Sequence, residues 1–143
     1  DGTLADKDVE ILHKLADWMR VNDECIHGTG LWRINQEGPT KIQEGQFADG
    51  ASRNFTSEDF RFTCRGGNIY AACMACPADG KLHIRSLREA DASHLPLWHG
   101  IVRKVEALGN PAQVAWTRDG EALHVDLGDY QSDMPVVVKI ITD

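Results

Sequence analysis

Two short motifs in this sequence contain residue types that carry out chemistry in other proteins. Cys73 and Cys76 form a Cys-x-x-Cys motif, a spacing found in zinc sites and in redox-active thiol pairs. Asp23 and Glu24 are adjacent carboxylates, and carboxyl groups can act as acid, base or nucleophile. Each motif therefore has a functional interpretation to set against a structural one.

The cysteine motif favours a structural interpretation. A structural zinc site usually takes its ligands from two such pairs, whereas Cys25 and Cys64 have no close partner in the sequence. A redox pair usually opens a helix, which lowers the thiol pKa, whereas this motif ends an apolar, strand-like segment just before Pro77. We expect small buried side chains here, and a metal or redox module is the weakest of three functional hypotheses.

The acid pair also favours a structural role. Neighbouring side chains on a strand point to opposite faces of a sheet, so Asp23 and Glu24 would not converge on one substrate bond if this segment is extended. The sequence just before them has a helical pattern. We therefore expect a helix end and a structural glutamate.

The histidines do not form a recognisable metal motif. They are His13, His27, His83, His94, His99 and His124. No two of them are four residues apart, which is the spacing that places two ligands on one helix face. His94 and His99 are close in sequence, but no third ligand accompanies them. We expect surface or hydrogen-bonded roles.

Charge and length exclude several classes of function. The 143 residues include 15 basic and 22 acidic side chains, a net charge of −7, and nucleic-acid binding needs a basic surface. The same sign disfavours an anionic membrane surface, and no apolar run approaches the ~18 residues of a membrane span. The chain suits one globular domain of ordinary size, with neither nucleic acid nor membrane as a partner.

One helix is expected near the start of the chain, over residues 6–21. Apolar side chains recur there at three- and four-residue steps, which places them along one stripe of a helix. The stripe consists of Ile11, Leu12, Leu15, Trp18 and Met19. A lone helix with one apolar stripe must bury it against something larger.

About seven short strands are expected in the rest of the chain, joined by turns. They lie within residues 60–65, 68–76, 81–87, 101–109, 113–117, 121–127 and 135–141. Connections this short require antiparallel pairing, and such strands bury their apolar faces as a two-layer sandwich. The predicted fold is mainly β, an antiparallel two-layer β-sandwich preceded by one N-terminal α-helix, with residues 36–54 as a loop or linker.

Several motifs along the chain occur in the order of a known family. They are Asp-Gly-Thr at 1–3, Asn-Asp-Glu-Cys-Ile-His-Gly-Thr-Gly-Leu-Trp at 22–32, Glu-Gly-Pro-Thr at 37–40, Asp-Phe-Arg-Phe-Thr at 59–63 and Ile-Tyr-Ala at 69–71. In this order the chain resembles the C-terminal region of α-L-fucosidases, retaining glycoside hydrolases that join a (β/α)8-like barrel to a β-sandwich. Asp23, Cys25 and His27 depart from the family pattern, which has glycine, alanine and tyrosine there, and indicate a divergent subgroup.

The resemblance implies a division of the chain and of the chemistry. Residues 1–46 would be the last barrel helix and its connection, and residues 47–143 the C-terminal sandwich. A retaining glycosidase uses two carboxyl groups about 5–5.5 Å apart, and in the family these lie in the barrel, upstream of this chain. No catalytic, cofactor-binding or metal-binding residue is therefore assigned, and the chain alone is expected to be inactive.

The resemblance also implies partners. They are the upstream catalytic barrel of the same protein and, through the parent enzyme, fucosylated glycans; the exposed helix stripe would otherwise fold back onto the sandwich or pair with a second copy. The alternative function is a carbohydrate-binding module, for which Trp98 is the best exposed side chain to stack on a sugar, while Trp18 and Trp32 are expected to pack where the barrel meets the sandwich. The compartment is left open between periplasm, secretion and lysosome.

Overall fold

The computed structural model describes residues 2–41, 54–93 and 95–143, which form one α-helix, two 3-10 helices and eight strands. The elements are α1 (Asp6–Asn22), η1 (Asp23–Cys25), β1 (Gln36–Glu37), β2 (Phe60–Arg65), β3 (Asn68–Cys73), β4 (Lys81–Ile84), η2 (Arg85–Leu87), β5 (Val102–Ala107), β6 (Ala115–Arg118), β7 (Leu123–Asp126) and β8 (Val136–Thr142). Within these residues no helix is both long and apolar enough to cross a membrane.

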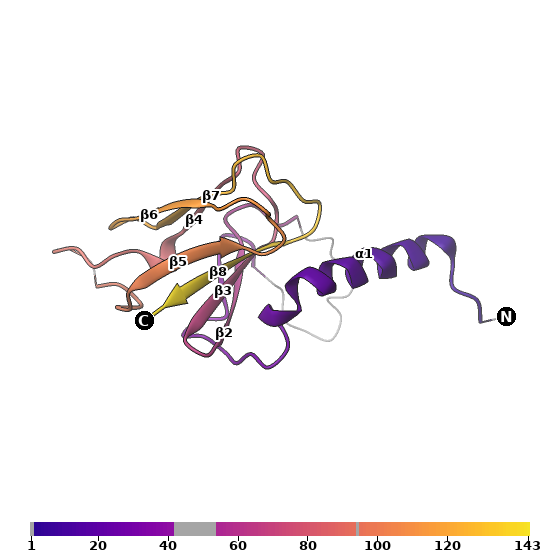
Figure 1. Ribbon diagram of the computed structural model, residues 1–143, viewed down its shortest axis with the longest axis horizontal. Helices are drawn as coiled ribbons and strands as arrows, with labels where there is room; N and C mark the ends of the chain where they lie inside the picture. The colour runs from indigo at the N-terminus through magenta and orange to yellow at the C-terminus, as the bar shows by residue number, and fades with distance from the viewer. Residues whose placement is uncertain (1, 42–53, 94) are drawn as a thin grey trace.

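The strands form two antiparallel sheets that face each other, as Figure 1 shows. One sheet has the order β1-β2-β3-β8-β5 and the other has the order β4-β7-β6. This confirms the predicted antiparallel two-layer sandwich after one N-terminal helix. All seven expected strands are present: β2 has the predicted bounds, β8 is shifted by one residue, and the other five are shorter than expected, with residues 85–87 of the third forming η2 instead. The additional strand, β1, has two residues, too few to produce a sequence pattern.

A tight hairpin joins β2 and β3 at the centre of the larger sheet. Gly66 and Gly67 have φ values of 57° and 85°, a backbone region that glycine enters without steric cost. The register then pairs Arg65 with Asn68 and continues to Phe60 opposite Cys73. This confirms the predicted hairpin, since two residues with positive φ match the twist of paired strands.

The main core lies between the two sheets. Phe60, Leu82, Leu123 and Ile140 are completely buried there, together with Val138. Alternate residues of each strand point inward, as the two-residue period of a strand requires. The outer face of the larger sheet carries a second, smaller cluster that contains Cys25, Tyr70 and Val137. Trp18 packs against this second cluster and so connects the helix to the sandwich.

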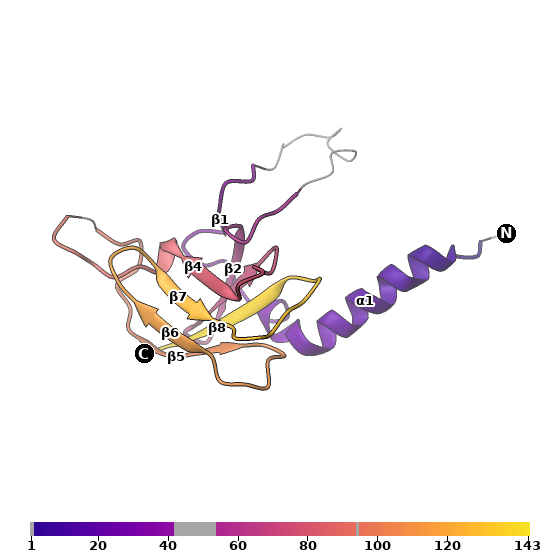
Figure 2. The same ribbon diagram turned by 90° about the horizontal axis from the view of Figure 1, so that it is seen from above.

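The helix α1 extends away from the sandwich and touches it only near its C-terminal end, as Figures 1 and 2 both show. The predicted helix is confirmed and ends one residue later than expected. Of the predicted stripe, Ile11, Leu12 and Leu15 are exposed by 55%, 51% and 46%. The helix therefore does not fold back onto the sandwich. The expected domain boundary at residues 46–47 lies outside the described residues and stays a prediction.

Candidate functional site

The exposed stripe of α1 and the joint at its C-terminal end form the most distinctive surface of the molecule. Leu4 continues the stripe at the N-terminal end of α1 and is 62% exposed. At the other end, the Trp18 indole N–H donates a hydrogen bond of 2.7 Å to the Pro135 carbonyl oxygen. The Asn22 amide then donates to the Trp18 carbonyl at 3.0 Å. The helix is thus anchored at its C-terminal end, with one further exposed ion pair of 3.5 Å between Lys14 and Asp133, and among the described residues nothing covers its apolar stripe.

A charged group lies at this joint. The Glu24 carboxylate accepts hydrogen bonds from Lys139 Nζ at 2.8 Å and from the Tyr70 hydroxyl at 3.0 Å. The Lys139 hydrogen bond holds the pKa of Glu24 below its ordinary value, although partial burial acts in the opposite direction. Burial, reinforced by Glu24, raises the pKa of Tyr70. The glutamate therefore ties the helix end to β3 and β8, which confirms the expected structural role.

Asp23 takes no part in this network. It lies on the same 3-10 turn as Glu24, where the chain leaves α1 by tightening its last turn, so the expected helix end is confirmed. The Asp23 carboxylate is exposed and lies 3.9 Å from His27 Nδ1. The two carboxylates engage separate partners and do not form an acid–base pair.

The segment after the joint runs along the edge of the larger sheet. The Thr63 hydroxyl donates to the Cys25 carbonyl at 2.7 Å, and Gly30 bridges to Cys64 through two backbone hydrogen bonds. Trp32 then packs on Phe62, with ring centroids 5.1 Å apart. Trp32 thus packs against the main core and Trp18 against the smaller cluster, which fixes the segment on the sandwich; their packing against a barrel stays a prediction.

A buried aspartate fixes the next turn of the chain. Asp59 is fully buried and accepts hydrogen bonds of 2.7–3.0 Å from the backbone and hydroxyl groups of Thr40 and Thr56. Burial alone would raise the pKa of Asp59, but these hydrogen bonds outweigh it and keep the pKa below its ordinary value. Gly38 has φ +120°, and a Cβ there would lie 2.6 Å from the Asp59 Cα. Only glycine fits this turn.

The cysteines have the character of packing residues. Burial raises the pKa of Cys25 and of Cys73 to about 11 in each case, the reverse of an activated thiol. The Cys73 thiol donates to the Ala75 carbonyl oxygen at 3.1 Å, and no disulfide joins the four cysteines. Across the described ranges, no three His, Cys, Asp or Glu side chains gather as metal ligands.

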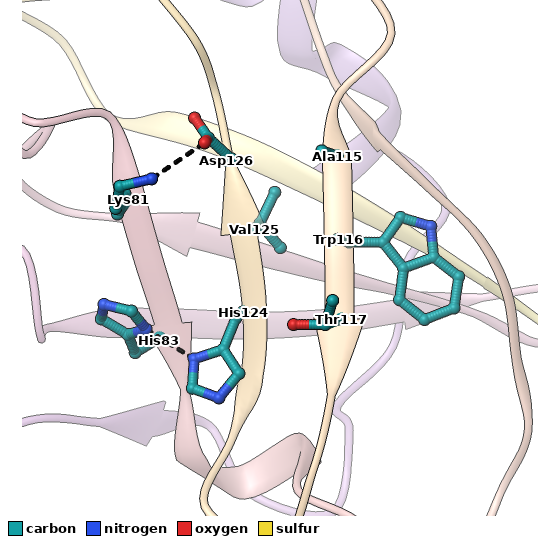
Figure 3. A pocket seen from close by; sticks show the side chains of 8 residues that line it. All are labelled: Lys81, His83, Ala115, Trp116, Thr117, His124, Val125 and Asp126. Carbon is teal, nitrogen blue, oxygen red and sulfur yellow. Dashed lines mark hydrogen bonds and ion pairs between the residues drawn. The ribbon is translucent and has the colours of Figure 1, made fainter.

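Two histidines that looked unrelated in the sequence lie together on the outer face of the smaller sheet. His83 on β4 and His124 on β7 are register partners, with Nδ1 atoms 2.7 Å apart (Figure 3). Asp119 lies 2.9 Å from the other nitrogen of His124. They line a shallow depression with the Lys81–Asp126 ion pair, whose atoms are 2.9 Å apart. Sequence spacing misses this pair because 41 residues separate its members; only the β4–β7 register reveals it.

The remaining histidines are dispersed. His13 is exposed on α1, His27 is exposed beyond the joint, and His94 lies outside the described residues. His99 is exposed beside the half-buried Trp98. The predicted exposure of Trp98 is therefore only partial, because Arg118 lies 5.0 Å from the centre of its ring. Trp116 is half-buried against the main core.

Comparison with known proteins gives a consistent result at the level of the fold. A scan against protein-family models and a search of curated proteins found no match. Among solved structures, Thermotoga maritima α-fucosidase in complex with a mechanism-based inhibitor matches 99% of this chain with a TM-score of 0.63 and 21% identity. The chain has the fold of part of an α-fucosidase. The same enzyme in complex with fucose gives a TM-score of 0.62 and 22% identity.

The match covers nearly all of this chain but only part of the fucosidase chains. This chain is covered to 99%, but it spans only 28% of the T. maritima α-fucosidase chain. Another solved α-L-fucosidase gives 99% and 27%, with a TM-score of 0.62 and 20% identity. The matched part corresponds to the C-terminal region of the fucosidases, as the sequence motifs predict. At this level of identity the likeness shows the fold, and activity is a separate question.

Proposed function

We propose that this chain is the non-catalytic C-terminal part of an α-L-fucosidase, a glycosidase that removes terminal α-L-fucose from glycans with retention of configuration. The fold likeness, which covers 99% of this chain and 28% of a fucosidase, supports the proposal. The two carboxyl groups that retention requires would come from the upstream barrel. By itself the chain would then be inactive.

The role of the chain in this proposal is to brace the barrel, and the observation that carries it is the bare face of α1. Ile11, Leu12 and Leu15 are each close to half exposed, although burying such side chains stabilises a protein by about 1.5–3 kcal/mol each. A single helix of this length is marginal in water without a packed face. The last helix of a barrel would bury this stripe against its neighbours.

The joint would make the brace rigid. Glu24 binds both Lys139 and Tyr70, and Trp18 is bound to Pro135, so the end of α1 is fixed to two central strands of the larger sheet. With a rigid connection, the orientation of the sandwich determines the orientation of the helix. Packing α1 into the barrel would therefore hold the barrel and the sandwich in one arrangement.

The test measures hydrolysis of a chromogenic α-L-fucoside by three preparations: the full-length parent, its upstream barrel alone, and the barrel mixed with this chain. We expect turnover by the parent, weak or no turnover by the unbraced barrel, partial recovery in the mixture, and none by the chain alone. NMR of the first-formed product gives the anomer and so tests retention. Turnover by the isolated chain would contradict the assignment of catalysis to the upstream barrel.

A further inference from the structure

A second cavity lies beside β6, where residues 88–93 and 95–101, together called the 88–101 loop, border the smaller sheet. Its volume is about 350 Å³, within the range of small-molecule sites. The side chains that define it are Glu89, Trp98, His99, Ile101, Trp116 and Arg118. Trp116 projects from β6 on the side away from the His83–His124 pair (Figure 3) and is the one residue that lines both this cavity and the depression on the outer face.

A half-buried arginine, Arg118, shapes the cavity. Arg118 donates to the backbone carbonyls of Leu87 at 2.6 Å, Gly100 at 2.8 Å and Arg88 at 3.0 Å. Its guanidinium also lies under the Trp98 ring. Gly100 has no room for a side chain, because a Cβ would overlap the Trp98 ring. The loop that forms one wall is therefore fixed before any ligand arrives.

The chemistry of the lining suits a ring with one apolar face and several hydroxyl groups. Trp98 and Trp116 pack partly against the core and give the cavity flat apolar walls. Glu89 and His99 are exposed at its mouth, and the structure gives their side chains no hydrogen bond or ion pair within the described residues. A carboxylate accepts several hydrogen bonds, and an imidazole both donates and accepts.

An anionic ligand fits less well. Of the five N–H donors of an arginine, those of Arg118 mostly serve backbone carbonyls, so no free fork faces the cavity for a phosphate or carboxylate. The Glu89 carboxylate at the mouth and the net charge of −7 both repel anions. A neutral polar ligand avoids both costs.

We propose that this cavity between the 88–101 loop and β6 binds a neutral pyranose unit of a glycan, with the ring against Trp98 or Trp116 and its hydroxyls on Glu89 and His99. The inference deepens the proposed function and rests on it for the choice of glycan. It would give the parent a contact with the glycan away from the catalytic barrel.

The experiment titrates the 143-residue chain, labelled with 15N, with L-fucose, lactose, a fucosylated lactose and inorganic phosphate. We expect the indole N–H signals of Trp98 and Trp116 to shift with the sugars, at millimolar affinity, and not with phosphate. Loss of one hydrogen bond weakens binding about fivefold, so Glu89→Gln and His99→Ala should each raise the Kd by at least that factor. Trp116→Phe keeps most of the packing and should also weaken binding.

Glu121→Gln and His27→Ala are the matched controls, since both residues are exposed and neither lines the cavity; they should bind as the unchanged chain does. The proposal is overturned if no sugar shifts either indole signal, if phosphate shifts them more than the sugars do, or if the Glu89 and His99 variants bind normally. Because the barrel is absent, failure of barrel complementation leaves this result intact, and a negative titration leaves the bracing role intact.

Discussion

Glu24 and Lys139 form an ion pair of 2.8 Å across the joint between α1 and the larger sheet. They are 115 residues apart in sequence, and the pair connects η1, which directly follows α1, to β8. The Tyr70 hydroxyl binds the same carboxylate oxygen, and these contacts fix where the helix leaves the sandwich. Single substitutions at this joint therefore test how rigidly the sandwich holds α1 in the proposed bracing role.

Removing the Lys139 charge should destabilise this joint. In Lys139→Met, Glu24 keeps only its Tyr70 partner while it stays partly buried, and we expect the free energy of unfolding to fall by about 1 kcal/mol, since solvent screens a half-open pair. Urea unfolding followed by tryptophan fluorescence gives this value. Lys81→Met breaks the more exposed pair with Asp126 and should leave stability unchanged; equal losses in the two variants would contradict the assignment.

Gly38 should be irreplaceable by alanine. A Cβ there would meet Asp59 Cα and the Glu58 carbonyl oxygen at 2.6 Å in a positive-φ backbone, so Gly38→Ala should lower the free energy of unfolding by more than about 2 kcal/mol. Gly128 also has a positive φ, 63°, but has open space around it. Gly128→Ala should therefore cost only about 1 kcal/mol. Similar losses at both positions in thermal or urea unfolding would show that the close contact is unimportant.

Acid should weaken the chain partly through Asp59. Its pKa in the folded chain lies below the ordinary value of 3.8, so the stabilisation is complete above that value. As the pH falls below it, the unfolded chain takes up the proton first, and the stabilisation shrinks until Asp59 itself is protonated in the folded chain. Urea midpoints measured from about pH 6 down to about pH 2.5 should fall accordingly.

Asp59→Asn tests this assignment. It should lower the free energy of unfolding at neutral pH by about 2 kcal/mol, because an amide cannot replace all the acceptor positions that Thr40 and Thr56 use, and it should flatten the acid dependence. Asp129→Asn, at an exposed position, should change neither. An unchanged acid slope in Asp59→Asn would assign the dependence to other carboxyls.

The sandwich was predictable because the sequence features that indicate strands and turns lie within short segments of the chain. Alternating apolar residues, as in Val136, Val138 and Ile140, report directly which side of a strand is buried, and Gly66-Gly67 reports the hairpin turn. The contacts at the joint and the His83–His124 pair were not predictable in this way. They depend on the register between strands far apart in sequence, which a single sequence without homologues does not contain.

The cavity lined by Trp98 and Trp116 was likewise not predictable from the sequence. The sequence predicts Trp98 to be an exposed aromatic side chain in a loop. No sequence feature marks Arg118, which shapes that loop, because its strand has the usual alternation of side chains between two faces. Its role follows from contacts with four backbone carbonyls, those of Leu87, Arg88, Trp98 and Gly100. The role of this half-buried arginine is recognised from its hydrogen-bond acceptors, which are known only from the structure of the loop.

The thiols should react in two classes. Cys25 and Cys73 are buried and have pKa values raised to about 11, so at about pH 8 very little thiolate is present and reagents have little access. Cys64 and Cys76 are only half-buried. We expect a thiol-reactive chromogenic disulfide to modify two cysteines readily in the native chain and four in denaturant. Rapid modification of Cys73 would revive the redox hypothesis for the Cys-x-x-Cys motif.

The bare stripe of α1 should govern association without contributing to the stability of the sandwich. Leu12→Gln and Leu15→Gln replace side chains that are about half exposed, so the free energy of unfolding of the isolated chain should change by less than about 0.5 kcal/mol.

Exposed apolar patches are interaction surfaces, and the unchanged chain should therefore associate with a second copy as its concentration rises, or with the barrel when the barrel is supplied. Light scattering measures the first and the complementation assay the second, and both variants should reduce both effects. His13→Gln, at an exposed position on the side of α1 opposite the stripe, is the matched control. A chain that stays monomeric at high concentration, with rapid hydrogen exchange along α1 even when the barrel is present, would show that the helix has no partner and would remove the physical basis of the bracing role.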